Sequence, residues 1–370
     1  MLINNQPYRS IWLHPEDQSI VQTFDQRLLP FEVVVMNLTT PEDARMAIRD
    51  MVVRGAPLIG ATGAAGLYLA TLLAGFTGQK EREEILHGWY TSLLASRPTA
   101  VNLRWALDRM YQAATRGISP AECRDLARAE FGAILEDEVD MSRKIGEHGL
   151  EILRKICRDK GGAPVNILTH CNAGWIACID YGTATAPVYL AREHNIPVHV
   201  YVDETRPRNQ GARLTAWELG ENGIPHHLIT DNAGGHLMQH GMVDLVIVGT
   251  DRTTRTGDVA NKIGTYLKAL AAKDNNIPFY VALPSSTIDW QISDGIREIP
   301  IEERGEDEVL YVDGWDGEKI SRVQVAANNT PVMNHGFDVT PARLITGLIT
   351  ERGVCEASEE GLLSLFLENR

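Results

Sequence analysis

The sequence predicts an α/β protein with two parts: a smaller, mostly helical N-terminal domain and a Rossmann-like domain with a mainly parallel sheet. Its 370 residues exceed what one hydrophobic core usually organises, about 250–300 residues. Helical patterns fill the first part, whereas from Gly161 onward short Val- and Ile-rich runs alternate with helix-like stretches. We therefore predict a helical domain over residues 1–145 and a Rossmann-like domain over residues 146–370.

The N-terminal domain is expected to begin with small strands within residues 12–24 and 32–36. Thr40 and Pro41, followed by two acidic residues, are typical of a helix start, and this helix should run to about Val53. Residues 55–79 carry no charge but are rich in Gly, Ala and Thr, which favours a buried helix over a membrane span. Further helices are predicted over residues 80–96, 100–115 and 120–158.

In the second domain, five apolar runs predict the strands of a parallel sheet. They cover residues 165–170, 198–202, 226–229, 244–248 and 279–283. The helix-like stretches between them indicate right-handed crossovers with helices on both faces. Such sheets bind ligands at the carboxyl ends of their strands. Polar or reactive residues follow every run: His170-Cys171-Asn172, residues 203–206, Thr230-Asp231, residues 249–252 and Pro284-Ser285.

Composition narrows the classes of partner. The chain has 35 Lys and Arg against 49 Asp and Glu, a formal net charge of −14, which disfavours binding to a nucleic-acid backbone. The cysteines number five and form no Cys-x-x-Cys pair, a pattern typical of reduced thiols. The first residues do not resemble a secretory signal. We expect a cytoplasmic protein that binds a small molecule, with neither a membrane nor nucleic acid as partner.

Cys171 and Asp251 are the candidates for chemistry at the strand ends. Cys171 lies ahead of residues 172–174, which should open a helix whose N-terminal dipoles would favour a thiolate. A role as a small buried apolar residue is the commonest fate of a free cysteine, and position alone leaves both interpretations open. Asp251 follows the apolar run 245–248, where burial can raise the pKa of a carboxyl into a catalytic range, although helix capping is a rival role.

Two further segments are candidates for anion or hydroxyl binding. Residues 257–265 combine a Gly-rich turn with a helix start, which would leave Asn261 and Lys262 near the beginning of that helix. Arg54 and the Gly-Ala-Pro that follows it precede the uncharged helix. At such a position a guanidinium group and backbone N–H groups can bind phosphate.

Common cofactor and metal motifs are missing or incomplete. No Gly-x-Gly-x-x-Gly follows a predicted strand, and the chain has no Gly-x-x-x-x-Gly-Lys-Ser/Thr loop, so no nucleotide cofactor is indicated. His236 and His240 are four residues apart on a predicted helix, but Leu237 stands where a zinc protease has Glu, and no third ligand is apparent. We expect neither a metal nor a cofactor.

Five blocks spread in order over nearly the whole chain resemble one family. They are residues 51–57 (MVVRGAP), 96–103 (SRPTAVNL), 169–174 (THCNAG), 204–207 with 210–215 (ETRP, QGARLT) and 257–266 (GDVANKIGTY). With them the chain resembles the methylthioribose-1-phosphate isomerase family. That family is a branch of a wider group related to translation initiation factor 2B, which also contains archaeal ribose-1,5-bisphosphate isomerases and regulatory subunits of a eukaryotic guanine-nucleotide exchange factor.

The resemblance implies a homodimer without metal or nucleotide cofactor that converts 5-methylthioribose 1-phosphate to 5-methylthioribulose 1-phosphate in methionine salvage. It implies that Cys171 and Asp251 are the catalytic pair. It further implies that the substrate contacts are Arg54, Gly55, Ala56, Arg97, Gln210, Asn261 and Lys262.

Alternatives to this substrate and this reaction route stay open. Residues 251–256 (DRTTRT) depart from the apolar turn expected after Asp251. The substrate 5-deoxyribose 1-phosphate would suit the same motifs, because pockets distinguish small apolar groups by only about 1–3 kcal/mol. A ribose-1,5-bisphosphate isomerase would need a second phosphate site. A non-catalytic regulatory subunit would keep the scaffold without needing the pair. The isomerisation has two possible routes, an enol phosphate or a hydride shift from C2 to C1.

Overall fold

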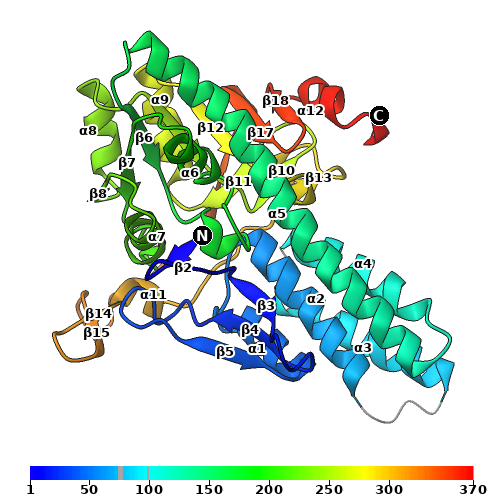
Figure 1. The fold of residues 1–370 in the computed structure, drawn as a ribbon. Coiled ribbons are helices and arrows are strands. Elements are labelled where there is room, and N and C mark those ends of the chain that lie inside the picture. Colours follow the sequence, from blue (N-terminus) through cyan, green and yellow to red (C-terminus); the bar gives the residue numbers. More distant parts are fainter. Residues whose placement is uncertain (74–77, 98–99, 370) are drawn as a thin grey trace.

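The computed structural model describes residues 1–73, 78–97 and 100–369, and it confirms the predicted α/β class (Figure 1). A group of helices lies on one side and a mainly parallel sheet on the other, and one long helix joins them. Residues 74–77 of the uncharged segment, and Pro98 and Thr99 of the second sequence block, lie outside the described residues.

The N-terminal part contains two small antiparallel sheets and five helices. Two strands pair in the first sheet, β1 (Leu2–Ile3) and β2 (Gln6–Pro7), and three in the second, β3 (Ile11–Leu13), β4 (Val21–Phe24) and β5 (Val35–Leu38). The helices are α1 (Pro41–Arg49), α2 (Ala56–Leu72), α3 (Gln79–Ser96), α4 (Val101–Thr115) and α5 (Pro120–Asp159). Thr40 caps α1, since its hydroxyl accepts the Asp43 N–H at 3.1 Å. This first helix ends at Arg49, four residues earlier than predicted.

The uncharged helix α2 is buried on all sides, because helices α1, α3, α4 and α5 all pack against it. Small residues permit this close packing. A Cβ atom on Gly60 would lie 2.9 Å from the backbone of Asn102, and one on Gly63 would lie 2.3 Å from the Leu103 side chain. In the part of the chain that the structure describes, no helix is both long and apolar enough to cross a membrane.

The second part is built on a seven-stranded sheet in the order β18-β17-β12-β9-β6-β7-β8, parallel except between β17 and β18. Five strands match the predicted runs: β6 (Val165–Thr169), β7 (Val198–Asp203), β8 (His226–Ile229), β9 (Leu245–Val248) and β12 (Phe279–Ala282). Two more extend the sheet, β17 (Gly347–Thr350) and β18 (Gly353–Cys355). The chain runs outward from β6 to β8 and then returns to the other side of β6 as β9. Ligands bind at such a reversal of strand order.

The helices of this part are α6 (Ala186–Glu193), α7 (Ala216–Glu221), α8 (Ala233–Gln239), α9 (Thr265–Asp274), α10 (Gly295–Glu298), α11 (Asp307–Leu310) and α12 (Glu359–Leu365). A hairpin of β14 (Tyr311–Trp315) and β15 (Ile320–Gln324) projects from the body beside α11 (Figure 1). A four-stranded sheet in the order β13-β10-β11-β16 was not predicted. Its strands are β10 (Arg252–Thr254), β11 (Val259–Lys262), β13 (Ile288–Asp289) and β16 (Phe337–Thr340).

This smaller sheet corrects one prediction. Asn261 and Lys262 lie on β11, where they pair with Asp338 and Phe337 of β16, and not at a helix start. Helix α9 begins only at Thr265. Pairing with a strand some 75 residues later determines the local conformation, and no pattern within residues 257–265 reveals that partner.

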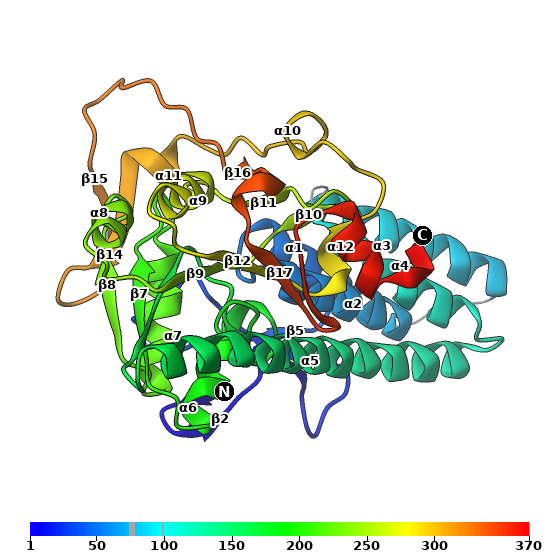
Figure 2. The ribbon, with the colours of Figure 1, turned by 90° about the horizontal axis from the view of Figure 1, so that it is seen from above.

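Helix α5 belongs to two hydrophobic cores. Phe131 and Ile134 lie in the core of the N-terminal helices, whereas Ile145 and Leu153 lie in a core beneath the large sheet. Figure 2 shows α5 running along the molecule from α6 and α7 to α4. The predicted domain division at residue 145 therefore falls within a continuous helix, and it stays a prediction.

Candidate active site

Cys171 follows β6 directly and has a left-handed backbone, with φ of 66°. Its N–H donates to Thr205 Oγ1 at 2.8 Å, and its thiol donates to Gln210 Oε1 at 3.1 Å. Both contacts come from the segment after β7, the neighbouring strand. Residues that are not glycine rarely adopt this conformation, so the surrounding hydrogen bonds hold the thiol in place.

The environment of Cys171 differs from the prediction of a helix-activated thiolate. The segment after it forms only a three-residue 3₁₀ turn, Trp175–Ala177, and the next α-helix begins at Ala186. Burial raises the pKa of the thiol, while the positive charges of Arg54 and Lys262 act in the opposite direction. A buried neutral thiol between two cations is therefore the form that this geometry favours.

Asp251 lies in the turn between β9 and β10, on the other side of the point where strand order reverses. Its N–H donates to the Ala260 carbonyl at 3.0 Å, which fixes the backbone against β11. Burial raises the pKa of its carboxyl, and the charges of Lys262, Arg97 and Arg54 oppose this rise. A carboxyl in this environment suits proton transfer.

Lys262 lies on β11, and its positive charge lowers the pKa of both Cys171 and Asp251. Its Nζ lies 4.7 Å from the centre of the Phe337 ring, and its side chain is buried. Burial lowers the pKa of this lysine, whereas Cys171 and Asp251 raise it. Asn261 precedes it and donates to Thr265 Oγ1 at 3.0 Å.

Arg54 reaches the site from the segment just before α2. Its guanidinium donates to Asn172 Oδ1 at 2.5 Å and also to the Asn172 carbonyl. Gly55 precedes Ala56 at the start of α2 with φ of 92°, and a Cβ there would lie 2.4 Å from Ala177 Cβ. Only glycine permits this approach of α2 to the Cys171 segment.

Arg97 closes the site from the end of α3. It donates to Met51 Sδ at 3.0 Å and lies 3.7 Å from Glu302. Burial lowers the pKa of this guanidinium, and the charges of Glu302 and Asp251 oppose that change. The structure thus gathers all nine predicted site residues, although their roles stay predictions.

Two adjoining cavities meet at this site. The first is polar and is lined by Arg54, Gly55, Ala56, His170, Cys171, Asp251 and Asn261, among others. The second shares Ala56 and Asp251 and is mainly apolar, with Ile59, Ala100, Ala260, Ile299, Pro300, Ile301 and Phe337 in its wall. Because they share these two residues, the cavities adjoin and form a partly open space with a more polar and a more apolar end.

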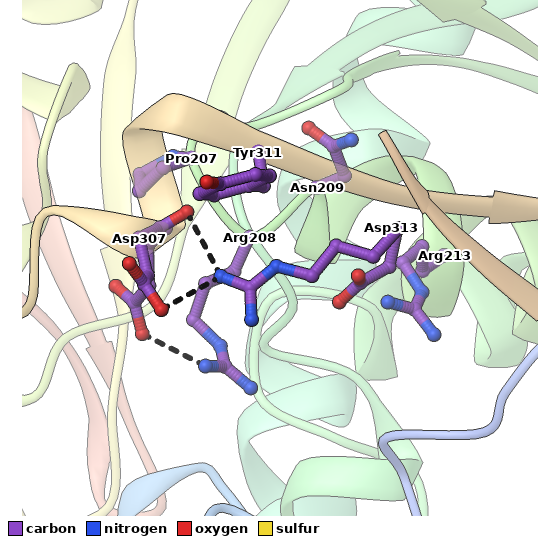
Figure 3. Close-up of a pocket in the computed structure, with 9 residues that line it drawn as sticks. Pro207, Arg208, Asn209, Arg213, Asp307, Tyr311 and Asp313 are labelled. Carbon is purple, nitrogen blue, oxygen red and sulfur yellow. Dashed lines mark hydrogen bonds and ion pairs between the residues drawn. The ribbon is translucent and has the colours of Figure 1, made fainter. Parts of the chain in front are cut away.

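A further cavity lies between the hairpin and the segment after β7 (Figure 3). Its charges are paired: Arg208 bonds to Glu308 at 2.8 Å, and Arg322 lies 3.0 Å from Asp307. Arg208 and Arg213 also line a narrow space that contains Arg54 and Gln210. Two arginines of the hairpin cavity therefore also line the space beside Arg54 and Gln210.

Three residues of the site were not predicted from the sequence. Asn172 lies within one of the five sequence blocks, but its hydrogen bond from Arg54 joins residues that are 118 positions apart. Glu302 and Arg304 lie in an irregular segment without periodicity, and their side chains pair at 2.6 Å. No local pattern marks them; only their place in the fold brings them to Arg97.

The described residues contain one group that could hold a metal ion, His170, Asp203 and Asp231. The ammonium group of Lys268 already lies 3.2 Å from Asp203 Oδ2. A second cation beside this ammonium would be repelled, so the donor set does not fit a metal. His240 Nδ1 bonds to the His236 carbonyl at 2.8 Å, so the histidine pair on α8 is also not arranged as a chelate.

The sequence profile of the initiation factor 2 subunit family matches residues 52–357. The chain belongs to this family. A family member from Desulfosudis oleivorans, named methylthioribose-1-phosphate isomerase, is 58% identical over 98% of each chain. The 5-methylthioribose 1-phosphate isomerase from Pyrococcus horikoshii OT3 has a similar structure, with a TM-score of 0.84, 37% identity and coverage of 98% of this chain and 97% of that one.

A second solved structure shows how broad the family is. The translation initiation factor eIF-2B subunit delta from A. fulgidus has a TM-score of 0.80 and 39% identity, covering 98% of this chain and all of that one. The resemblance proposed from the five sequence blocks is therefore confirmed. Relatives in this family are named either as enzymes or as initiation-factor subunits, so the chemistry of the site must decide between these two functions.

Proposed function

We propose that the protein is an aldose–ketose isomerase that converts 5-methylthioribose 1-phosphate to 5-methylthioribulose 1-phosphate in methionine salvage. The observation that carries this proposal is the enclosure of Cys171 and Asp251 in one cavity, where Arg54 and Lys262 act on both. The name of the relative from Desulfosudis oleivorans supports the same reaction. Hydrogen moves between two carbons of one molecule, so the electrons balance without a redox cofactor.

Asp251 is assigned the role of acid and base. A C1 phosphate locks the sugar as a furanosyl phosphate, so an acid must protonate the ring oxygen before the ring opens. Burial raises the pKa of Asp251 and thereby keeps more of its carboxyl protonated near neutral pH, as an acid catalyst requires. The resulting carboxylate can then accept the C2 proton in the enol route, or the C2 hydroxyl proton in the hydride route.

Cys171 is assigned the second proton-handling or charge-stabilising role. Burial raises the pKa of its thiol, so the S–H persists and can donate a hydrogen bond to a substrate oxygen. Turnover in deuterium oxide separates the two routes. Deuterium from solvent enters C1 of the product in the enol route, whereas a hydride shift leaves C1 with the original hydrogen.

The cations are assigned to the phosphate. Arg54 lines the polar end of the space and Arg97 lines the adjoining cavity, and together with Lys262 they lower the pKa of the Asp251 carboxyl. Gln210, Asn261 and the backbone of Gly55 and Ala56 supply hydrogen-bonding groups beside them. Buried cations with spare donors suit an anionic ligand of this kind.

The apolar end of the space supports a 5-methylthio or 5-deoxy sugar over a 1,5-bisphosphate. Ile59, Ile301 and Phe337 contribute to its wall. The two arginines that reach it face carboxylates, since Arg97 lies 3.7 Å from Glu302 and Arg252 lies 3.8 Å from Asp289. A second phosphate would have to compete with these carboxylates, whereas a thioether or methyl group is accommodated by apolar contact.

The deciding experiment compares kcat/KM for 5-methylthioribose 1-phosphate, 5-deoxyribose 1-phosphate and ribose 1,5-bisphosphate with the purified chain. We expect the first to be converted, the second to be accepted within about 100-fold because the two differ by a small apolar group, and the bisphosphate to be the poorest substrate. Preference for the bisphosphate would refute the substrate class. A chain that converts none of them would instead be a non-catalytic regulatory subunit.

We further propose a cytoplasmic homodimer. The five cysteines are all free, which suits a reducing compartment. The edge strand β8 exposes Leu228 (51% exposed) and leaves one side of its backbone unpaired, a surface that a second copy could cover. Light scattering at micromolar concentration should give twice the mass of 40.9 kDa, and a monomer would refute this assembly.

A further inference from the structure

A buried group of charges adjoins the site, with His170 in the wall of the polar cavity, and has no part in the chemistry assigned above. It consists of His170, Asp203, Lys268 and Asp231, which come from the ends of β6, β7 and β8 and from α9. His170 is 1% exposed and Asp203 is not exposed at all. Burying such groups costs several kcal/mol per ion unless they are paired, so their arrangement is constrained.

The hydrogen bonds of His170 determine where its protons lie. Nδ1 is 2.9 Å from Asp203 Oδ2, and Nε2 is 2.8 Å from the carbonyl oxygen of Ile263. A carbonyl can only accept, and the ammonium of Lys268, 3.2 Å from the same Oδ2, favours an ionised Asp203 that also only accepts. A ring with protons on both nitrogens satisfies both acceptors, because each nitrogen then donates.

The His170 ring connects the two sides of the site, the Cys171 side and the Lys262 side. On one flank it is the residue before Cys171, whose N–H donates to Thr205 Oγ1. Thr205 is held in turn by Asp231, whose Oδ1 accepts its N–H at 2.8 Å. On the other flank it binds the carbonyl of Ile263, the residue after Lys262.

We propose that His170 is a positioning residue: as an imidazolium clamped between Asp203 and Ile263, it fixes the Cys171 thiol relative to the Lys262 ammonium. This inference rests on the proposed isomerase function. It explains why a left-handed cysteine is tolerated at the end of β6, because the residue before it is anchored from both sides. It also explains why Lys268 occupies the place where the other three side chains could hold a metal.

The first test observes the ring directly. Long-range ¹⁵N–¹H spectra of ring-labelled wild type at pH 7.5 should show one histidine with protons on both nitrogens, assigned by its loss in His170→Gln. The charged groups that face this ring are Asp203, Asp231, Lys268 and, from β16, Asp338. A His170 ring with one bare nitrogen would overturn the proposal, and this measurement needs no substrate.

The second test is kinetic. Gln at position 170 can donate to only one of the two acceptors, so Cys171 and Lys262 should shift relative to each other, and kcat should fall about 10- to 100-fold. KM should change less than kcat, because Arg54 and Arg97 still hold the phosphate. His236→Gln, on the exposed face of α8, is the matched control and should keep both constants. Wild-type kcat in folded His170→Gln would overturn the proposal.

A substrate-free readout separates this proposal from the proposed function. Alkylation of Cys171 by iodoacetamide, followed by mass spectrometry of its peptide, should be several-fold faster in His170→Gln than in wild type, while Cys178 stays protected. Unchanged Cys171 alkylation would count against positioning, even in a chain that proves not to be an isomerase. A chain that isomerises no sugar but shows the doubly protonated ring and the faster alkylation would lose only the proposed function.

Discussion

Burial raises the pKa of both Cys171 and Asp251. The charges of Arg54 and Lys262 oppose both rises, and that of Arg97 also opposes the rise at Asp251. The two groups therefore share one electrostatic environment and are expected to act together. A change that removes either proton donor leaves the cations, and hence ligand binding, largely in place.

Cys171→Ser and Asp251→Asn should each fold and bind the sugar phosphate but lose at least about 100-fold in kcat, the usual scale for a positioned acid or base. Steady-state kinetics with circular dichroism of the folded variants checks this. Cys157→Ser on α5 and Asp274→Asn at the end of α9 are matched controls and should keep wild-type turnover. Wild-type kcat in either site variant would remove that residue from the mechanism.

Glu138 offers a separate test of buried charge. It lies on α5, where Ser286 donates to its Oε1 at 3.1 Å, and burial raises its pKa from 4.5 to about 8. The folded state therefore binds the proton more tightly than the unfolded chain. Its contribution to stability is complete below pH 4.5 and is lost as the pH rises toward 8, by at most about 1.4 kcal/mol per pH unit.

Glu138→Gln stays neutral and should remove this part of the pH dependence. Urea unfolding from pH 5 to 8 should show a shallower fall in the free energy of unfolding than in wild type. Glu151→Gln, an exposed substitution on the same helix, should leave the slope unchanged. Equal slopes in wild type and Glu138→Gln would mean that Glu138 is ionised throughout.

The packing of α5 against α6 depends on two glycines. A Cβ on Gly149 would lie 2.3 Å from Pro187 Cγ, and one on Gly146 would lie 2.8 Å from Leu190 Cδ1. Gly132, on the same helix, would place a Cβ in open space. Close contact with α6 explains glycine at the first two positions, where its poor intrinsic helix propensity would otherwise disfavour it.

Gly149→Ala should therefore destabilise the fold by about 1–3 kcal/mol, the cost of overpacking, despite the better propensity of alanine. Gly132→Ala should stabilise it by about 0.5–1 kcal/mol. Urea denaturation of both variants measures the difference. A stabilising Gly149→Ala would show that α5 and α6 can separate without cost.

The elements differ in how far the sequence predicts them. The five predicted strands of the large sheet and α5 are found within a few residues, because apolar runs and a helix start mark them locally. β10, β11, β13 and β16 are two to four residues long and exist through pairing with distant segments, so no local pattern reveals them. The predicted helix after Cys171 is wrong because the segment 172–185 must pass beneath α2, where Gly55 meets Ala177.

The site shows the same division at a finer level. The rule that ligands lie beyond strand ends places Cys171 and Asp251 correctly, after the ends of the neighbouring strands β6 and β9. Glu302 and Arg304 lie in an irregular stretch, and the contacts of Asn172 span 118 residues, so their part in the site follows only from the three-dimensional arrangement.

At the scale of the molecule, α5 carries side chains of both hydrophobic cores without a break. We expect the two cores to unfold together, because melting either one removes packing from the same helix. Native-state hydrogen exchange should give equal opening free energies for the amides of Phe131 and Ile167, which lie one in each core. A clearly weaker N-terminal core would instead support independent domains divided near residue 145.

The strand order also determines when the protein can first be complete. β6 lies between β7 and β9, and β9 leaves the ribosome about 80 residues after β6, roughly 4–16 s at usual rates of translation. During that interval the apolar β6 has one open edge, which can pair with other nascent chains. Until β9 arrives Asp251 is also absent, so the same event covers the open edge of β6 and assembles the pair. Slower translation or a shortage of chaperones should therefore reduce the yield of soluble protein without altering the molecules that do fold.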